Sequence, residues 1–431
     1  MAKPHKSSKK HPTGKPEKHK GGGPNPPVTT TPAPVAPVSG DPVFGQPTLS
    51  PDPTSFKDPV TDSNDVDVAG VQAVPQPATT AAEPILTLAQ VYGSQGAAVT
   101  AAIQSAGQIV FHCVGDTGSD AGPQTQSLVA DKMVTDFTET DAADVPKFYY
   151  HLGDVVYYFG ESEYYYDQFF EPYRNYPAPI LGIPGNHDGI VYPTDPETTL
   201  EGYLQNFCAA TFVPSPDAGG LDRTTMIQPG VYYTFDAPFV RILGLYSNVL
   251  EDPGVISDQG GTYPTLDQRQ VTFLTTALGR IKSENYTGAV IIAVHHPPYT
   301  GGVEHGGSPL MLQDIDNGCT AAGVWPHAVL SGHSHNYQRY MRTVNAYQIP
   351  YVVAGCGGHS PLSAMRSTLR TPYPIDSTLT LESYDATDYG YLRIVVNATT
   401  LTIEFHPASD GGTTKTPDDT VTVNLAARTV S

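Results

Sequence analysis

Five short polar clusters contain the residue types that bind metal ions. Each cluster alone is weak evidence, because a Gly-Asp pair after a strand is usually a turn and an isolated histidine is usually structural. Together and in order, they favour a site that holds two metal ions through mixed oxygen and nitrogen ligands. The clusters are GDTG with Asp116, GDVVYY with Asp154 and Tyr157, GNHD with Asn186, His187 and Asp188, VHHPPY with His295 and His296, and GHSHNYQR with His333 and His335.

Two neighbouring ions impose further requirements on these residues. One carboxylate has to bridge the ions, and positions have to stay open for water and substrate. Asp154 is the predicted bridge. His333 and His335 are separated by one residue. In a tight loop, each of them can therefore give an imidazole to a different ion.

The elements that must position these clusters are strands, because each cluster directly follows an apolar run. Candidate helices lie between some of them, at residues 85–107 and 265–281. Strand, polar loop and helix in alternation predict an α/β layered domain, with the site at the carboxyl ends of the strands. The apolar runs are residues 108–114, 148–152, 179–183, 240–245, 289–294, 327–331 and 350–355.

Composition divides the chain into four parts. Residues 1–65 are rich in Pro, Lys, Gly, Thr and Ser and predict a disordered basic tail. We predict a linker at 66–83, a single catalytic domain at 84–410 and a polar C-terminal segment at 411–431. The last recognisable strand signal, at 388–406, predicts two antiparallel strands joined by a turn around Asn397 and Ala398.

Charge restricts the partners of the protein. The chain has 43 acidic and 23 basic residues and a net charge of −20, and seven of its lysines lie within the first 20 residues. Such an acidic body repels polyanions, so no nucleic-acid partner is expected, whereas small phosphate esters stay open as substrates. The oligomeric state is not indicated.

Cysteine use and hydropathy leave the compartment open. Cys113, Cys208, Cys319 and Cys356 are expected to be free thiols, with a bond between Cys208 and Cys319 as the alternative. No run is long and apolar enough to span a bilayer, and no apolar stretch follows the basic N-terminus as in a secretory signal. The localisation stays undecided between the cytoplasm and export without such a signal.

The ordered clusters resemble the calcineurin-like metallophosphoesterase superfamily over residues 109–340, and more narrowly its purple acid phosphatase branch. General members begin with Asp-x-His, but here Asp116 is followed by Thr117 and Gly118. Tyr157 stands three residues after Asp154, which is the GDxxY arrangement of the purple branch. A phenolate is a hard donor that suits ferric iron.

The resemblance implies a layered metallophosphoesterase sandwich and a ligand set. Asp116, Asp154, Tyr157 and His335 would hold ferric iron. Asp154, Asn186, His295 and His333 would hold a second, divalent metal, which would be iron, zinc or manganese. His295 is favoured over His296, because it directly follows the apolar run and matches the position of the family's ligand.

The resemblance also implies an activity, which is hydrolysis of phosphomonoesters by in-line attack of a metal-bound hydroxide, as in an acid phosphatase. His187 and His305 resemble the family's histidines that bind phosphate oxygens and help to protonate the leaving group. The alternatives are a phosphodiesterase or nucleotidase with the same metal core, or a silent protein that binds metal or phosphate. Related plant enzymes carry an N-terminal β-sandwich, for which this chain has no room before residue 84.

Several supporting residues receive more modest expectations. Asp188 is expected to orient His187 or a ligand, and Tyr337 and Arg339 to support packing and the loop. The tyrosine-rich stretch 157–176 is expected to be a packed amphipathic helix. No function is expected of the histidines outside the motifs, which are His5, His11, His19, His112, His151, His327, His359 and His406.

Overall fold

Two β-sheets carry the clusters identified in the sequence. The structure, a computed structural model, describes residues 40–46, 50–52, 56, 70–409 and 415–431. The predicted tail at 1–65 therefore lies mostly outside the described residues. The division of the chain at residues 66, 84 and 411 stays a prediction, although Val71 and Val74 of the predicted linker are buried in the core.

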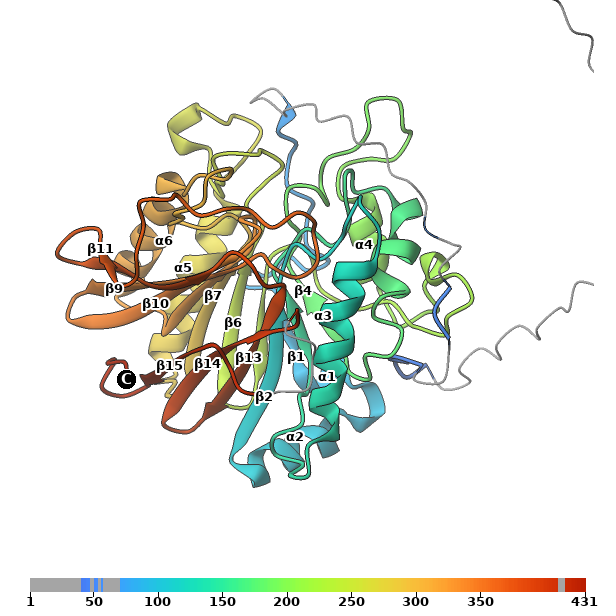
Figure 1. The fold of residues 1–431 in the computed structure, drawn as a ribbon, viewed down its shortest axis with the longest axis horizontal. Helices are drawn as coiled ribbons and strands as arrows, with labels where there is room; N and C mark the ends of the chain where they lie inside the picture. The colour runs from blue at the N-terminus through green and yellow to red at the C-terminus, as the bar shows by residue number, and fades with distance from the viewer. Residues whose placement is uncertain (1–39, 47–49, 53–55, 57–69, 410–414) are drawn as a thin grey trace, which may run out of the picture. The chain divides into compact units, whose positions relative to one another are not determined.

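The larger sheet has nine strands and the smaller has six (Figure 1). The order in the larger sheet is β1 (Ile85–Thr87), β5 (Tyr233–Ala237), β6 (Val240–Leu245), β7 (Ala289–Val294), β8 (Ala328–Ser331), β10 (Tyr347–Ala354), β9 (Tyr337–Val344), β12 (Leu379–Asp385) and β11 (Tyr373–Pro374). In the smaller sheet it is β15 (Asp419–Asn424), β14 (Thr400–Pro407), β13 (Gly390–Asn397), β2 (Gln108–Val114), β3 (Tyr149–His151) and β4 (Ile180–Gly182).

Parallel pairing places the ends of the central strands together. β2, β3 and β4 are parallel in the smaller sheet, and β6, β7, β8 and β10 are parallel in the larger one. The predicted strands before all five clusters are confirmed. The predicted pair at 388–406 is also confirmed, because β13 and β14 are antiparallel neighbours.

Buried aromatic side chains fill the space between the two sheets. Tyr150 of β3 lies 6.5 Å from both Tyr233 and Phe235 of β5, measured between ring centroids. A Cβ added at Gly244 of β6 would collide with the hydroxyl of Tyr150. The sheets therefore pack face to face, and the predicted α/β layered class is confirmed.

Helices lie beside both sheets. They are α1 (Leu88–Val91), α2 (Gly96–Ala106), α3 (Gln124–Thr135), α4 (Glu201–Phe207), α5 (Arg269–Ser283) and α6 (Pro309–Ala322). α5 confirms the helix predicted at 265–281, and it buries Phe273, Leu274, Ala277, Leu278 and Ile281 along one face. α5 packs closely on α6, since a Cβ at Gly318 would lie 2.8 Å from Leu274. Among the described residues, no helix has the length and apolarity that a membrane crossing requires.

Three local expectations differ from the structure. The stretch 157–176 is not an amphipathic helix but a series of short helical turns, at Ser162–Tyr164 and Tyr166–Phe170. Most of its aromatic side chains are buried, and so are several polar ones, among them Asp167, Gln168 and Glu171, so the polar residues do not form one exposed face. The predicted helix at 85–107 is divided into β1, α1 and α2.

The third difference lies in the polar segment 411–431. It contains β15, which pairs with β14 and buries Val421 and Val423 on alternate positions. Asp419 of this strand accepts hydrogen bonds from the hydroxyl of Tyr337 (2.7 Å) and from the guanidinium of Arg339 (2.7 and 2.9 Å). These two residues therefore support packing as predicted. All four cysteines, which lie in described parts of the chain, are free.

Candidate metal centre

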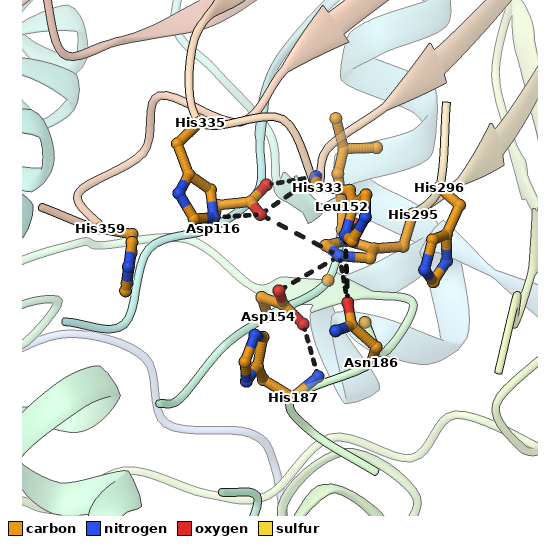
Figure 2. A network of polar contacts seen from close by, with 12 residues as sticks. Asp116, Leu152, Asp154, Asn186, His187, His295, His296, His333, His335 and His359 are labelled. Atoms are coloured by element: carbon orange, nitrogen blue, oxygen red, sulfur yellow. Dashed lines mark hydrogen bonds and ion pairs between the residues drawn. The ribbon is translucent and has the colours of Figure 1, made fainter. Parts of the chain in front are cut away.

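The five clusters meet where the parallel strands end (Figure 2). Asp116 follows β2, Asp154 follows β3, Asn186 and His187 follow β4, His295 follows β7, and His333 and His335 follow β8. Figure 2 shows the imidazoles grouped around the carboxylates of Asp116 and Asp154. Two adjacent groups of donor atoms can be distinguished within this cluster.

The first group surrounds the phenol oxygen of Tyr157. It lies 2.7 Å from Oδ2 of Asp154, 3.2 Å from Oδ1 of Asp116 and 3.2 Å from Nε2 of His335. Nε2 of His335 lies 3.6 Å from Oδ1 of Asp116. The four residues expected at the ferric position therefore converge on a single point.

The second group surrounds Nε2 of His295. This nitrogen lies 3.2 Å from Oδ2 of Asp154 and 3.1 Å from Oδ1 of Asn186. Oδ1 of Asn186 lies 3.2 Å from Nδ1 of His333. Asp154 belongs to both groups, as a bridging carboxylate requires.

The backbone directs these side chains inward. Asp116, Asp154 and His333 have left-handed backbones, with φ of 56°, 54° and 67°. This conformation costs non-glycine residues free energy and is concentrated at functional sites. The turn places the His333 amide 3.0 and 2.8 Å from the two carboxylate oxygens of Asp116. Likewise, the His187 amide donates to Oδ1 of Asp154 at 2.9 Å.

Gly153 makes this close approach feasible. Its φ is 98°, and an added Cβ would lie 2.6 Å from the amide nitrogen of Gly185 and 2.7 Å from Nδ1 of His295. Three loops therefore meet where no side chain fits. The glycine of the GDVVYY cluster is explained by this packing as well as by its backbone angle.

The protonation states suit metal binding. Nδ1 of His295 donates to the carbonyl oxygen of Leu152 at 2.8 Å, which leaves Nε2 to face the oxygens of Asp154 and Asn186. Three atoms that carry lone pairs then face one another and require a positive charge between them. Burial lowers the pKa of His295, but Asp154 and Asp116 outweigh it and raise this pKa to about 9. Without metal, a proton supplies that charge.

Burial and neighbouring charges also shift the pKa values of the other donors. Burial raises the pKa of Asp116 well above its usual range, and neighbouring Asp154 adds to the effect. At Asp154, burial is outweighed by His295 and His187, which hold its pKa below the usual value. Burial and the neighbouring imidazoles lower the pKa values of His333 and His335, so both rings are neutral donors.

The residues present fit a pair of metal ions. Ligands about 2.1 Å from a common octahedral ion stand about 3 Å apart, and the donor separations in both groups are close to this spacing. Nε2 of His333 is buried without a hydrogen-bond partner among the described residues. Phenol and carboxylate donors predominate in the first group, whereas imidazoles and an amide oxygen do so in the second.

The two predicted catalytic histidines lie at the edge of this cluster. Nδ1 of His187 donates to the carbonyl oxygen of Tyr158 at 2.8 Å, which leaves its Nε2 for another partner. The ring of His305 lies beside those of His333 and His335, at ring-centroid distances of 4.5 and 4.9 Å. The structure therefore brings every sequence-predicted site residue into one region.

Asp188 and His296 are buried beside the cluster and make polar contacts of their own. Asp188 does not contact His187 through its carboxylate, which instead accepts from the amides of Val155 (2.9 Å) and Gly185 (2.8 Å). It therefore fixes the backbone on both sides of the site. His296 is buried, and its ring bonds Ser247 and the carbonyl oxygen of Leu250.

Sequence reasoning missed two residues at the site. His359 follows β10 and stacks on Tyr157 at 4.0 Å, while His187 covers Tyr157 at 4.3 Å. The rule that polar residues gather after parallel strands could have found His359, because the run at 350–355 precedes it. Glu251 was also missed, and its carboxylate lies 3.4 Å from Nδ1 of His305. No motif signals it.

Comparisons with known proteins identify the family. A family model described as calcineurin-like phosphoesterase matches residues 110–337, more than half of the chain. A second, described as iron/zinc purple acid phosphatase-like protein C, matches residues 349–415. A search of curated proteins found no significant match.

Solved structures with similarity to the chain are distant. One titled "GAP50 the anchor in the inner membrane complex of Plasmodium" is 13% identical, with a TM-score of 0.49, and the match covers 74% of this chain and 89% of that one. One titled "Structure of PhoD" is 12% identical, with a TM-score of 0.43 and coverage of 75% and 71%. The assignment rests on the family models rather than on these structures. The chain belongs to the calcineurin-like phosphoesterases, has a C-terminal segment similar to that of iron/zinc purple acid phosphatase-like proteins, and is a metal-dependent hydrolase of phosphate esters.

Proposed function

We propose that the protein is an acid phosphatase that hydrolyses small phosphomonoesters with a ferric ion and a divalent ion. The observation that carries the proposal is the position of Tyr157, whose phenol oxygen lies within 3.2 Å of donor atoms from Asp116, Asp154 and His335. A buried phenol with two carboxylates is a hard, anionic ligand set of the kind that ferric iron prefers.

The side chains would form two metal positions, one for the ferric ion and one for the divalent ion. Asp116, Tyr157 and His335 would hold the ferric ion. Asn186, His295 and His333 would hold iron, zinc or manganese in the divalent state, and Asp154 would bridge the two. When bound, such a pair binds phosphate oxygens and acidifies a water molecule, which permits hydrolysis at acidic pH.

His187 and His305 would act on the substrate. The Nδ1 proton of His187 is bound to a backbone carbonyl, so its ring is held with Nε2 available for a phosphate oxygen. His305 lies beside the imidazoles of His333 and His335, where it can give a proton to the departing alkoxide. No covalent phosphoenzyme is needed.

Visible absorption with metal analysis tests the ferric assignment. The iron-loaded protein should be coloured by a tyrosinate-to-iron band, and Tyr157→Phe should abolish that band. Tyr158→Phe is the matched control and should keep it. A colourless, active and iron-free enzyme would refute the ferric centre and leave the two-metal esterase intact.

Substrate class needs a separate measurement. Rates of hydrolysis of aryl monoesters should exceed those of matched diesters. The reverse ratio would favour the phosphodiesterase alternative, and complete lack of hydrolysis in a fully metallated sample would favour a silent binding protein.

A further inference from the structure

Glu251 lies between a candidate metal ligand and a candidate catalytic histidine. It follows β6 in a loop, and its side chain is 39% exposed. Its Oε2 accepts a hydrogen bond from Nδ2 of Asn186 at 3.3 Å. Its Oε1 lies 3.4 Å from Nδ1 of His305. Each oxygen of one carboxylate therefore faces a different functional residue.

The contact with Asn186 determines which end of the amide faces the metal position. Only the amide oxygen can bind a metal ion, whereas the nitrogen is a donor of two protons. Because Nδ2 is directed to Glu251, Oδ1 faces His295 and His333, at 3.1 and 3.2 Å. An amide turned the other way would present protons to this position.

The contact with His305 orients the ring. His305 belongs to a glycine-rich loop, and its Nδ1 has no hydrogen-bond partner among the described residues, so the carboxylate of Glu251 is its nearest ionic partner. With Nδ1 directed to Glu251, Nε2 is left for the substrate. Glu304, the preceding residue, points elsewhere and accepts from the hydroxyl of Ser363 at 2.6 Å.

We propose that Glu251 is a positioning residue that holds the Asn186 amide with its oxygen toward the divalent metal and the His305 ring with its Nε2 toward the leaving group. The first part rests on the proposed metal positions alone, whereas the second also rests on the proposed hydrolysis. Groups that orient metal ligands typically change metal affinity by about 10- to 100-fold when they are removed.

Zinc binding tests the first part without any catalytic readout. Zinc titration in competition with a chromophoric chelator should give two sites in the wild-type protein. Glu251→Ala should weaken one of them by about 10-fold and leave the other unchanged. Glu304→Gln, which alters an adjacent carboxylate that touches neither group, should match the wild type at both sites.

Leaving-group dependence tests the second part. A nitrophenyl phosphate needs little protonation of its leaving group, whereas glycerol 2-phosphate needs a proton donor. Glu251→Ala should therefore lower kcat about 10-fold more for glycerol 2-phosphate than for the nitrophenyl ester. Glu304→Gln should leave this ratio unchanged.

Glu251→Gln is the conservative variant that guards against a folding defect. The glutamine keeps one oxygen acceptor, which can contact Asn186 or His305 but not both. Either the zinc affinity or the ratio of kcat values for the two esters should therefore return toward the wild-type value. Thermal unfolding checks that each variant is folded.

Several outcomes would overturn the proposal. Equal losses of kcat for both esters with unchanged zinc affinity would show a merely structural role. Three zinc ions in the wild type and two in Glu251→Ala would show that Glu251 ligates a further ion with His305 and His333, whose ligand atoms lie within 4.8 Å of one another. If neither ester is hydrolysed by the metallated wild type, the proposed function fails, and the zinc measurement still decides the role at Asn186.

Discussion

The phenol oxygen of Tyr157 lies 2.7 Å from Oδ2 of Asp154, although the two residues are only three positions apart. The backbone of Asp154 is left-handed, with φ of 54°. Burial raises the pKa of Tyr157 far above its usual value, and the carboxylates of Asp154 and Asp116 add to the effect. Without metal the phenol therefore keeps its proton and donates it to Asp154, and an ion that binds there must displace that proton.

Gly153→Ala should destroy metal binding. The added Cβ would press on the backbone of Gly185 and on the ring of His295 at 2.6 and 2.7 Å, and the residue would keep a φ of 98°. We expect a loss of stability of about 2 kcal/mol or more and no retained zinc. Gly260→Ala is the control. It introduces backbone strain at a φ of 68° without a collision, because nothing lies within 4 Å of the new methyl group. Metal content that survives in Gly153→Ala would contradict the packing argument.

His359→Ala should impair the site more than it impairs the fold. The ring stacks on Tyr157 at 4.0 Å and on His335 at 4.4 Å, and such pairs contribute about 0.5–1.5 kcal/mol beyond their buried area. We expect a modest fall in melting temperature and a fall in kcat of about 10-fold, because both rings lose a supporting face. His406→Ala is the control, since that buried ring stacks on Tyr391. It should lower stability without changing kcat.

Removal of metal should destabilise the protein. The buried carboxylates of Asp116 and Asp154 lie in one cluster with His295, and bound cations relieve their repulsion. Free zinc at 100 times its dissociation constant adds about 2.7 kcal/mol per site. Differential scanning fluorimetry with and without a chelator measures this change. Asp154→Asn, which lacks the carboxylate that we propose bridges the two ions, should show a much smaller difference between the two conditions.

Acid should destabilise the fold through His327. Burial, with Arg428 nearby, lowers its pKa from 6.5 to about 3, and its Nδ1 accepts from the amide of Val290 at 2.9 Å. Below pH 6.5 the His327 ring therefore binds a proton in the unfolded chain but stays neutral in the folded chain. The contribution of His327 to the free energy of unfolding is present above pH 6.5 and is lost as the pH falls toward 3.

The size of this effect can be measured by urea unfolding. Between pH 7.5 and pH 5 the contribution of His327 should fall by about 2 kcal/mol. His327→Gln, which does not titrate, should be less stable at pH 7.5 but should lose about 2 kcal/mol less on acidification. Parallel curves for the two proteins would show that His327 does not control the acid sensitivity.

The central strands and the ligand clusters could be predicted because both depend on local pattern. An apolar run such as 289–294 can only be a buried strand or a buried helix segment, and its length favours the strand. Parallel strands of one sheet end at the same edge, so Asp116 and Asp154 after β2 and β3 could be placed together, as could His295 and His333 after β7 and β8. That the two sets meet depends on how the two sheets pack.

Other features could not be predicted because they depend on distant contacts. The aromatic stretch 157–176 buries polar as well as aromatic side chains, and only the surrounding core decides how it turns. β15 is too polar to be recognised until β14 offers an edge for pairing. Glu251 reaches the site from a loop whose path no sequence pattern describes.

The ion pair between Arg339 and Asp419 joins segments that are synthesised at different times. The loop with His333 and His335 leads into β9, and β9 is anchored on a strand about 80 residues further along the chain. The ribosome synthesises the candidate ligands His333 and His335 well before it synthesises Asp419. The contacts that tie the start of β9 to β15 therefore form only after residue 419 has been synthesised.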